Sequence, residues 1–142
     1  MPGIRSAGIS TNIPLRGEPI MTDFEVRGSH AGASATTSNS DLRVRFDTAT
    51  ADYFRAMGMH LVRGKPLSGS PEPAPVKDAV VNERFVQDFL QGADPIGLRI
   101  AVFGQETEVS GVVADTYVWS PHVNPSPEIF VHAFQNDFWR GR

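Results

Sequence analysis

Residues 79–100 read AVVNERFVQDFLQGADPIGLRI, and the local patterns in this stretch decide the fold. The run before Asn82 contains two β-branched valines and favours a short buried strand. Asn82 carries a side-chain oxygen that can accept hydrogen bonds from the unpaired N–H groups at the start of a helix. Glu83 suits the positive end of that helix. The stretch therefore predicts a strand that leads directly into a helix capped by Asn82.

The helix after Asn82 is expected to be amphipathic, with polar residues toward water and one apolar stripe. The stripe consists of Phe85, Val86, Phe89 and Leu90. Gly92 can adopt the left-handed conformation that ends a helix, and residues 94–97, DPIG, have the composition of a turn. A second strand is expected from Leu98 onward. No side chain in this stretch is required for catalysis, so the stretch specifies a fold rather than a reaction.

A unit of the same type occurs earlier in the chain. Residues 42–46 alternate apolar and charged side chains like a half-buried strand. Residues 51–57 suit a short helix that Gly58 can end, and a further strand completes the unit. Residues 42–63 and 79–103 are therefore expected to share the order strand, helix, glycine, strand.

Two such units side by side predict an α+β domain: a mixed β-sheet in the order βαββαβ with two short helices on one face. Further strands are expected at 4–13, 24–27, 98–103, 107–118 and 128–134, with a hairpin turn at 104–105. Parts of 1–41 and 104–134 are expected to form a small β-rich lobe. Residues 28–41 are small and polar and predict a mobile loop. Residues 68–78 hold three prolines and predict a stiff exposed connection.

The composition is that of a single globular domain over residues 1–142. Of these residues 40% are hydrophobic and 20% are charged, and the net charge is -3. A weakly negative chain without a polybasic run has no general attraction to nucleic acids or anionic membranes. The chain has no cysteine, which excludes disulfides and thiolate chemistry. The first residues lack a signal-peptide pattern, and no apolar run reaches the roughly 18 to 20 residues of a membrane span, so neither is expected.

The polar residues do not form a recognisable active site. His122 and His132 flank a proline-rich loop, but no carboxylate stands at metal-ligand spacing from two histidines, so surface or hydrogen-bonded roles are favoured over a metal site. The carboxylates of Glu83, Asp115 and Glu128 could meet in space. Each is explained by a helix start or a strand end, and a catalytic pair would require perturbed pKa values. We therefore expect no catalytic, metal or cofactor site.

Two tryptophans are the candidates for a contact surface. Trp119 and Trp139 lie near a loop and near the chain end, where exposed aromatic side chains usually contact a partner or a ligand. Residues 119–127, WSPHVNPSP, form the proline-rich loop that also contains His122. We expect Trp119, His122 and Trp139 to face a partner.

Eight short blocks occur in a characteristic order along the chain. They are PGIRSAG at 2–8, IPLRG at 13–17, DYFRAMGM at 52–59, LVRGKPL at 61–67, VVNERF at 80–85, DPIGLRI at 94–100, EVSGVVAD at 108–115 and PEIFV at 127–131. Together these blocks resemble the MacB-like periplasmic core domain of MacB-type and FtsX-like ABC transporter permeases, in particular the large permeases of acidobacteria. The resemblance covers most of residues 2–135.

The resemblance implies a non-enzymatic domain outside the membrane, between the first and second transmembrane helices of an efflux or export permease. It implies a place on the periplasmic face of the bacterial inner membrane, where the domain couples ATPase-driven motion to substrate or partner handling. The implied partners are the transmembrane and ATPase parts of the same transporter, and a periplasmic adaptor protein or an exported substrate. A dimer in the full transporter also fits, whereas nucleic acid and cofactors do not.

The tail after Gln135 departs from the pattern, and the membrane helices are absent, which predicts an excised domain or a truncated reading frame. Two other functions stay open on the sequence. One is a free-standing ligand-binding module that holds a sugar or peptide with Trp119 and Trp139, and a shift of their fluorescence on ligand addition would favour it. The other is a small hydrolase, which a pH-dependent activity lost on replacing His122 or Asp115 would favour.

Overall fold

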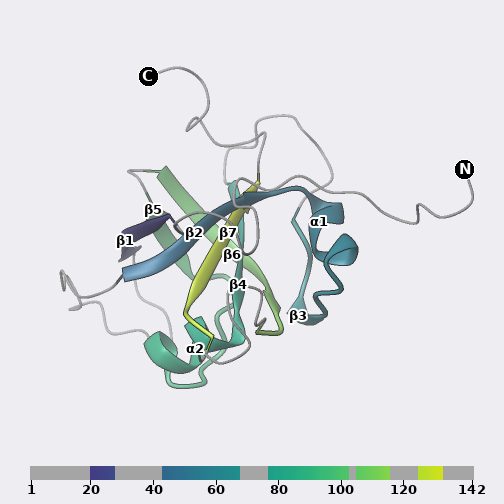
Figure 1. Cartoon of the computed structure of the whole chain (residues 1–142). Coiled ribbons are helices and arrows are strands. Elements are labelled where there is room, and N and C mark those ends of the chain that lie inside the picture. Colours follow the sequence, from purple (N-terminus) through teal and green to yellow (C-terminus); the bar gives the residue numbers. More distant parts are fainter. Residues whose placement is uncertain (1–19, 28–42, 68–76, 103–104, 116–124, 133–142) are drawn as a thin grey trace, which may run out of the picture.

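The computed structural model describes residues 20–27, 43–67, 77–102, 105–115 and 125–132 (Figure 1). Within these ranges seven strands and two helices follow one another along the chain. In order they are β1 (Met21–Arg27), β2 (Arg43–Ala49), α1 (Ala51–Ala56), β3 (Leu61–Gly64), β4 (Lys77–Asn82), α2 (Glu83–Leu90), β5 (Arg99–Val102), β6 (Gln105–Val113) and β7 (Glu128–His132).

The strands form one sheet that closes on itself. Their order is β3-β6-β4-β7-β2-β1-β5, and β5 also pairs with β6, so six strands make a hydrogen-bonded ring and β3 is attached outside it. The β2–β7 and β4–β6 pairs are parallel and the other pairs are antiparallel. β6 is long enough to pair with β5 near its start and with β3 near its end.

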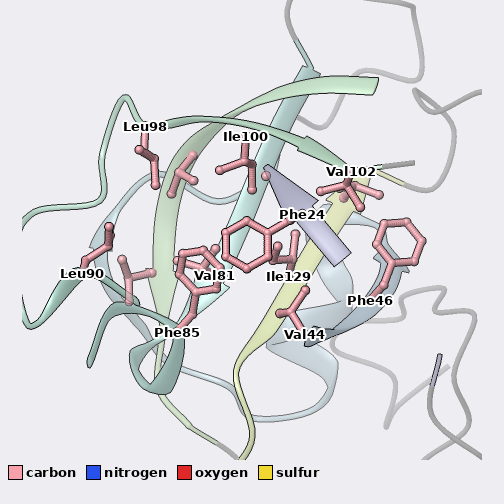
Figure 2. Packing of buried hydrophobic residues seen from close by; sticks show 14 residues of the cluster. Phe24, Val44, Phe46, Val81, Phe85, Leu90, Leu98, Ile100, Val102 and Ile129 are labelled. Atoms are coloured by element: carbon pink, nitrogen blue, oxygen red, sulfur yellow. The ribbon is translucent and has the colours of Figure 1, made fainter. Parts of the chain in front are cut away.

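The ring encloses a core, which we call the inner cluster. It contains Phe24, Val44, Phe46, Ala79, Val81, Phe85, Leu90, Leu98, Ile100, Val102, Val109, Val112, Ile129 and Val131. All six ring strands contribute to it, because alternate residues of a strand point to the same side of a sheet. α2 adds Phe85 and Leu90, and Figure 2 shows Phe24 and Phe85 side by side in the middle of the cluster.

A second core, the outer cluster, lies on the other side of the sheet. It contains Ala49, Tyr53, Phe54, Met59, Leu67, Val80, Val113 and Phe130. Val80 and Phe130 alternate with the inward-facing valines and isoleucine of β4 and β7, and α1 covers them with Tyr53 and Phe54. The Phe54 and Phe130 rings pack edge to face with centroids 5.0 Å apart. The central strands are therefore buried on both faces.

The predicted helix signals of the opening stretch are confirmed. Asn82 Oδ1 accepts a hydrogen bond from the Phe85 N–H at 3.0 Å, which caps α2. The helix ends at two successive left-handed residues, Gln91 with φ 52° and Gly92 with φ 83°. Gly58, with φ 68°, follows α1 as expected. These features depend on residues three or four positions apart, which the sequence displays directly.

The arrangement of the elements differs from the prediction in three respects. The two helices lie on opposite faces of the sheet rather than on one face, since α1 joins the outer cluster and α2 the inner cluster. The two units do not form a separate βαββαβ sheet, because β7 inserts between β2 and β4. The expected β-rich lobe is not separate, because β1, β6 and β7 pair with strands of both units in a single sheet.

Some element bounds also differ. β6 ends at Val113, before the predicted end at 118, and Gln105 pairs with Val102 instead of occupying the hairpin turn. The predicted strand at 4–13 and the predicted mobile loop at 28–41 lie outside the described residues.

Candidate functional site

The charged residues that the structure buries gather where β2 and β7 run side by side. Arg45 of β2 lies opposite Glu128 of β7 in the parallel register. Asp47 follows two residues later on the same face of β2 and is 1% exposed, and Glu128 is 7% exposed. Asp115, after β6, acts electrostatically on Glu128. We call Arg45, Asp47, Asp115 and Glu128 the acid cluster.

Glu128 loses its proton less readily than an ordinary glutamate, first because it is buried and second because it has acidic neighbours. Burial raises the pKa of Glu128 to about 8, the nearby Asp47 carboxylate pushes it in the same direction, and Arg45 opposes both. Burial also lowers the pKa of the Arg45 guanidinium, an effect that Glu128 counteracts. At neutral pH Glu128 is therefore mainly the neutral acid.

Asn82 joins the end of β4 to the start of β7. Its Oδ1 accepts hydrogen bonds from the backbone N–H of Phe85 and of Glu128, each at 3.0 Å. Its Nδ2 donates to the Ser126 carbonyl oxygen at 2.8 Å. Asn82 is 3% exposed, so these bonds are shielded from water. The sequence predicted the helix cap but not the two contacts to residues 126–128, which are distant along the chain.

Asp115 supports the same helix start. Its Oδ1 accepts a hydrogen bond from the Arg84 backbone N–H at 2.8 Å. The carboxylate thus accepts a hydrogen bond from a second N–H group in the first turn of α2. Its negative charge also interacts favourably with the positive end of the helix dipole. Asn82 and Asp115 both act on backbone groups, and this use is structural.

The three carboxylates singled out in the sequence are brought together only in part. Asp115 and Glu128 lie within electrostatic reach of each other. Glu83 instead lines a cleft of about 190 Å³ between β3, α2 and β6. Asp47, which the sequence analysis missed, is the buried neighbour of Glu128. In a longer strand, Asp47 would lie on the same face as Arg45, two residues earlier. The predicted strand ended at Phe46, so this position was not considered.

The pKa shift of Glu128 leads to a stability prediction. The folded chain keeps this proton up to about pH 8, whereas an unfolded glutamate loses it near pH 4.5, so the folded state binds more protons between these values. Stability should therefore fall as pH rises through this window, by at most about 1.4 kcal/mol per pH unit. Glu128→Gln should flatten the profile.

Urea denaturation at pH 5.5, 6.5 and 7.5 measures this slope. The matched control is Glu106→Gln, on the exposed side of β6, which should keep the slope of the parent chain. An unchanged slope in Glu128→Gln would mean that Glu128 is ionised throughout, and the acid cluster would need another explanation.

The residues predicted to face a partner lie outside the described ranges. These are Trp119, His122 and Trp139. His132, the other histidine that flanks the proline-rich loop, ends β7 and is 3% exposed. Among the residues that the structure describes, no group of three or more His, Cys, Asp and Glu side chains is placed to hold a metal ion. No helix in the described ranges has the length and apolar character of a membrane span.

Comparisons with known proteins were made for sequence and for structure. A family model described as the MacB-like periplasmic core domain matches residues 10–140. No sequence among the curated proteins matches the chain.

Two solved structures are among those to which the chain is similar. The periplasmic region of MacB from Actinobacillus actinomycetemcomitans is 18% identical with a TM-score of 0.50, and the match covers 82% of this chain and 58% of that chain. The extracellular domain of the noncanonic ABC-type transporter YknZ from Gram-positive bacteria is 13% identical with a TM-score of 0.47, over 79% of this chain and 53% of that chain. The chain thus spans a little over half the length of these domains. Because the family model covers nearly all of the sequence, the chain belongs to the family of MacB-like periplasmic core domains of ABC transporter permeases.

Proposed function

We propose that this domain is a non-enzymatic relay in an ABC-type efflux or export permease, and that it transmits ATPase-driven motion to a substrate or partner protein on the periplasmic side. The observation that carries the proposal is the closed six-strand ring with a packed core on each side of its central strands. Protein interiors packed in this way deform little, so a force applied at one end moves the whole body.

The use of the polar groups supports a role without catalysis. The side chains of Asn82 and Asp115 accept hydrogen bonds from backbone N–H groups at the start of α2. Glu128 and Asp47 are buried in the sheet and are not among the residues that line the cleft. A catalytic acid or base must come within hydrogen-bond reach of a substrate. The perturbed pKa of Glu128 therefore fits a buried structural acid.

Family membership supports the choice of partners. The transmembrane and ATPase parts of the same permease would drive the domain, and an adaptor protein or exported substrate would receive the motion, with the permease working as a dimer. The free-standing sugar- or peptide-binding module is not favoured, because Trp119 and Trp139 fall within the residues that match the permease family.

The relay role can be tested by distance measurements in the full-length permease. The domain has no cysteine, so spin labels can be attached at Glu25→Cys on β1 and Gln87→Cys on α2, two exposed positions. The distance between these labels should stay constant when ATP is added and hydrolysed. The distance from either label to one in the transmembrane part should change.

Two results would contradict the relay. A change of the distance between Glu25→Cys and Gln87→Cys during the ATP cycle would show that the domain deforms instead of moving as one body. Turnover of a substrate by the isolated domain would show that it is an enzyme. The matched control is a pair of labels with one at Gln87→Cys and the other in the transmembrane part. The distance between these two labels reports whether the whole domain moves during the ATP cycle.

A further inference from the structure

The start of β7 is attached to the sheet less firmly than the rest of the strand. Residues 129–131 pair with β2 on one side and with β4 on the other, whereas the register places Glu128 opposite Arg45 of β2 and beyond the last β4 pair. Residues 129–131 are at most 4% exposed, but residues 126–127 are partly exposed. We call residues 126–128 the β7 latch. The strand thus has a firmly held middle and a start that borders on water.

Hydrogen bonds to Arg45 and Asn82 hold the β7 latch in place. The Arg45 N–H donates to the Pro127 carbonyl oxygen at 3.0 Å. Asn82 accepts a hydrogen bond from the Glu128 N–H at 3.0 Å and donates one to the Ser126 carbonyl oxygen at 2.8 Å. Pro127 has no N–H group with which to add another bond. The latch can therefore be released by breaking a small number of contacts.

The latch carries a buried carboxyl group. Glu128 is 7% exposed, and its side chain lies on the same face of β7 as Phe130 of the outer cluster. Among the described residues, the charged groups that act on it are Arg45 and Asp47 of β2 and Asp115 after β6. Burial first, and then the two acidic neighbours, raise the pKa of Glu128 to about 8 against the opposing effect of Arg45. The carboxylate form is therefore more stable in water than in this position.

The Glu128 carboxylate can reach water in two ways: the whole domain unfolds, or only the latch moves. Unfolding exposes both cores of the domain to water. Moving the latch leaves both cores covered, and it leaves the α2 cap in place, because the bond from the Phe85 N–H to Asn82 does not involve residues 126–128. Native proteins open locally at such lightly held segments. Release of the latch therefore requires less free energy than unfolding.

We propose that the β7 latch is a pH-sensitive device: it stays closed while Glu128 is neutral, and ionisation of Glu128 releases it from Arg45 and Asn82 while residues 129–131 remain in the sheet. The closed state keeps the Glu128 proton up to about pH 8, whereas a hydrated glutamate loses it near pH 4.5. The open fraction therefore rises by up to about tenfold per pH unit between these values and levels off above the upper one. This inference does not depend on the relay role.

Amide hydrogen exchange of the 142-residue chain between pH 5.5 and 8.5 tests the latch. The N–H groups of Arg45 and Glu128 report its release, and the N–H of Val109, bonded to the Leu98 carbonyl oxygen at 2.8 Å, reports unfolding of the core. Each measured rate is compared with that of an unstructured peptide at the same pH, which cancels ordinary base catalysis. Protection at Arg45 and Glu128 should fall by up to about tenfold per pH unit and level off near pH 8. It should be lower than at Val109 and, unlike protection at Val109, insensitive to a low urea concentration, because release exposes little surface.

Three variants connect the exchange to Glu128. Glu128→Gln keeps the size of the side chain and removes its titration, so protection at Arg45 should no longer depend on pH. Glu106→Gln, on the exposed side of β6, is the matched control and should keep the slope of the parent chain. Asp47→Asn tests the proposal even if Glu128→Gln does not fold. With one acidic neighbour removed, Glu128 loses its proton more readily, and the pH at which protection levels off should move down.

Several results would overturn the latch. Equal protection and equal urea response at Arg45, Glu128 and Val109 would show that the domain opens only as a whole. Protection at Arg45 and Glu128 that does not change with pH in the parent chain would show that ionisation of Glu128 releases nothing. A slope that persists in Glu128→Gln would come from another group, such as a histidine, whose ordinary pKa is about 6.5.

Discussion

Phe85→Ala is expected to lower the free energy of unfolding by about 3 to 5 kcal/mol, the range for deleting a fully buried aromatic side chain. Phe85 is 0% exposed, and its ring lies 5.2 Å from that of Phe24 and 5.1 Å from that of Phe89, between centroids. The alanine would leave a cavity at the point where α2 packs into the ring, and the strands around it cannot close the gap without breaking their register. Domains of this size are stable by only about 5 to 15 kcal/mol, so the variant should be near its unfolding threshold.

Urea denaturation followed by circular dichroism measures the effect. Phe89→Ala is the matched control, because Phe89 lies one turn later on the same helix and is only partly buried. It should cost clearly less than Phe85→Ala. Equal costs for the two variants would mean that α2 does not insert Phe85 into the inner cluster as described.

Asn82→Ala is expected to destabilise the domain by about 2 to 4 kcal/mol. The loss of a helix cap costs about 1 kcal/mol. The substitution also leaves the Glu128 N–H and the Ser126 carbonyl without the bonds that Asn82 makes to them, and an unsatisfied buried group costs about 1 to 3 kcal/mol. The total exceeds what a cap alone predicts, because Asn82 connects two parts of the chain.

Asn82→Ser separates the two contributions. Serine is a good helix cap but is too short to reach Ser126, so this variant should regain about 1 kcal/mol relative to alanine. Thermal and urea unfolding of the parent and both variants give the comparison. If Asn82→Ser were as stable as the parent chain, the contacts to residues 126–128 would contribute nothing.

The sequence predicted the features that depend on near neighbours. The cap at Asn82 and the glycine after α1 follow from backbone groups a few residues apart, and both are present. The order of strands does not follow from such patterns, because β7 lies between β2 and β4 although it comes last of the described strands. One indication was present: the apolar runs 79–81 and 129–131 are continuous rather than alternating, which is typical of strands buried on both faces. Strands with such runs need other side chains packed against both faces of the sheet.

Fewer residues of the candidate site than of the fold could be predicted from the sequence. Asp47 is buried because Ala49 extends β2 past the predicted end of the strand, and a charge in a buried strand has no local signature. The exposure of Met57, Leu61 and Val62 was also missed, since these residues look like ordinary core residues in the sequence, whereas the sheet order leaves β3 attached to β6 outside the ring. Exposure is a property of the assembled fold, so a linear pattern cannot report it.

The place of β7 in the sheet has a consequence for how the domain is made. A ribosome and a secretion channel both deliver a chain from its beginning, so β1 to β6 emerge before β7. Until β7 arrives, β2 and β4 each lack the neighbour that lies between them, and the ring stays open. Pairings between distant segments form late because the loop that joins them must first be closed. The closed ring is thus completed only after residues 128–132 emerge, so the last described strand decides when the native sheet can form.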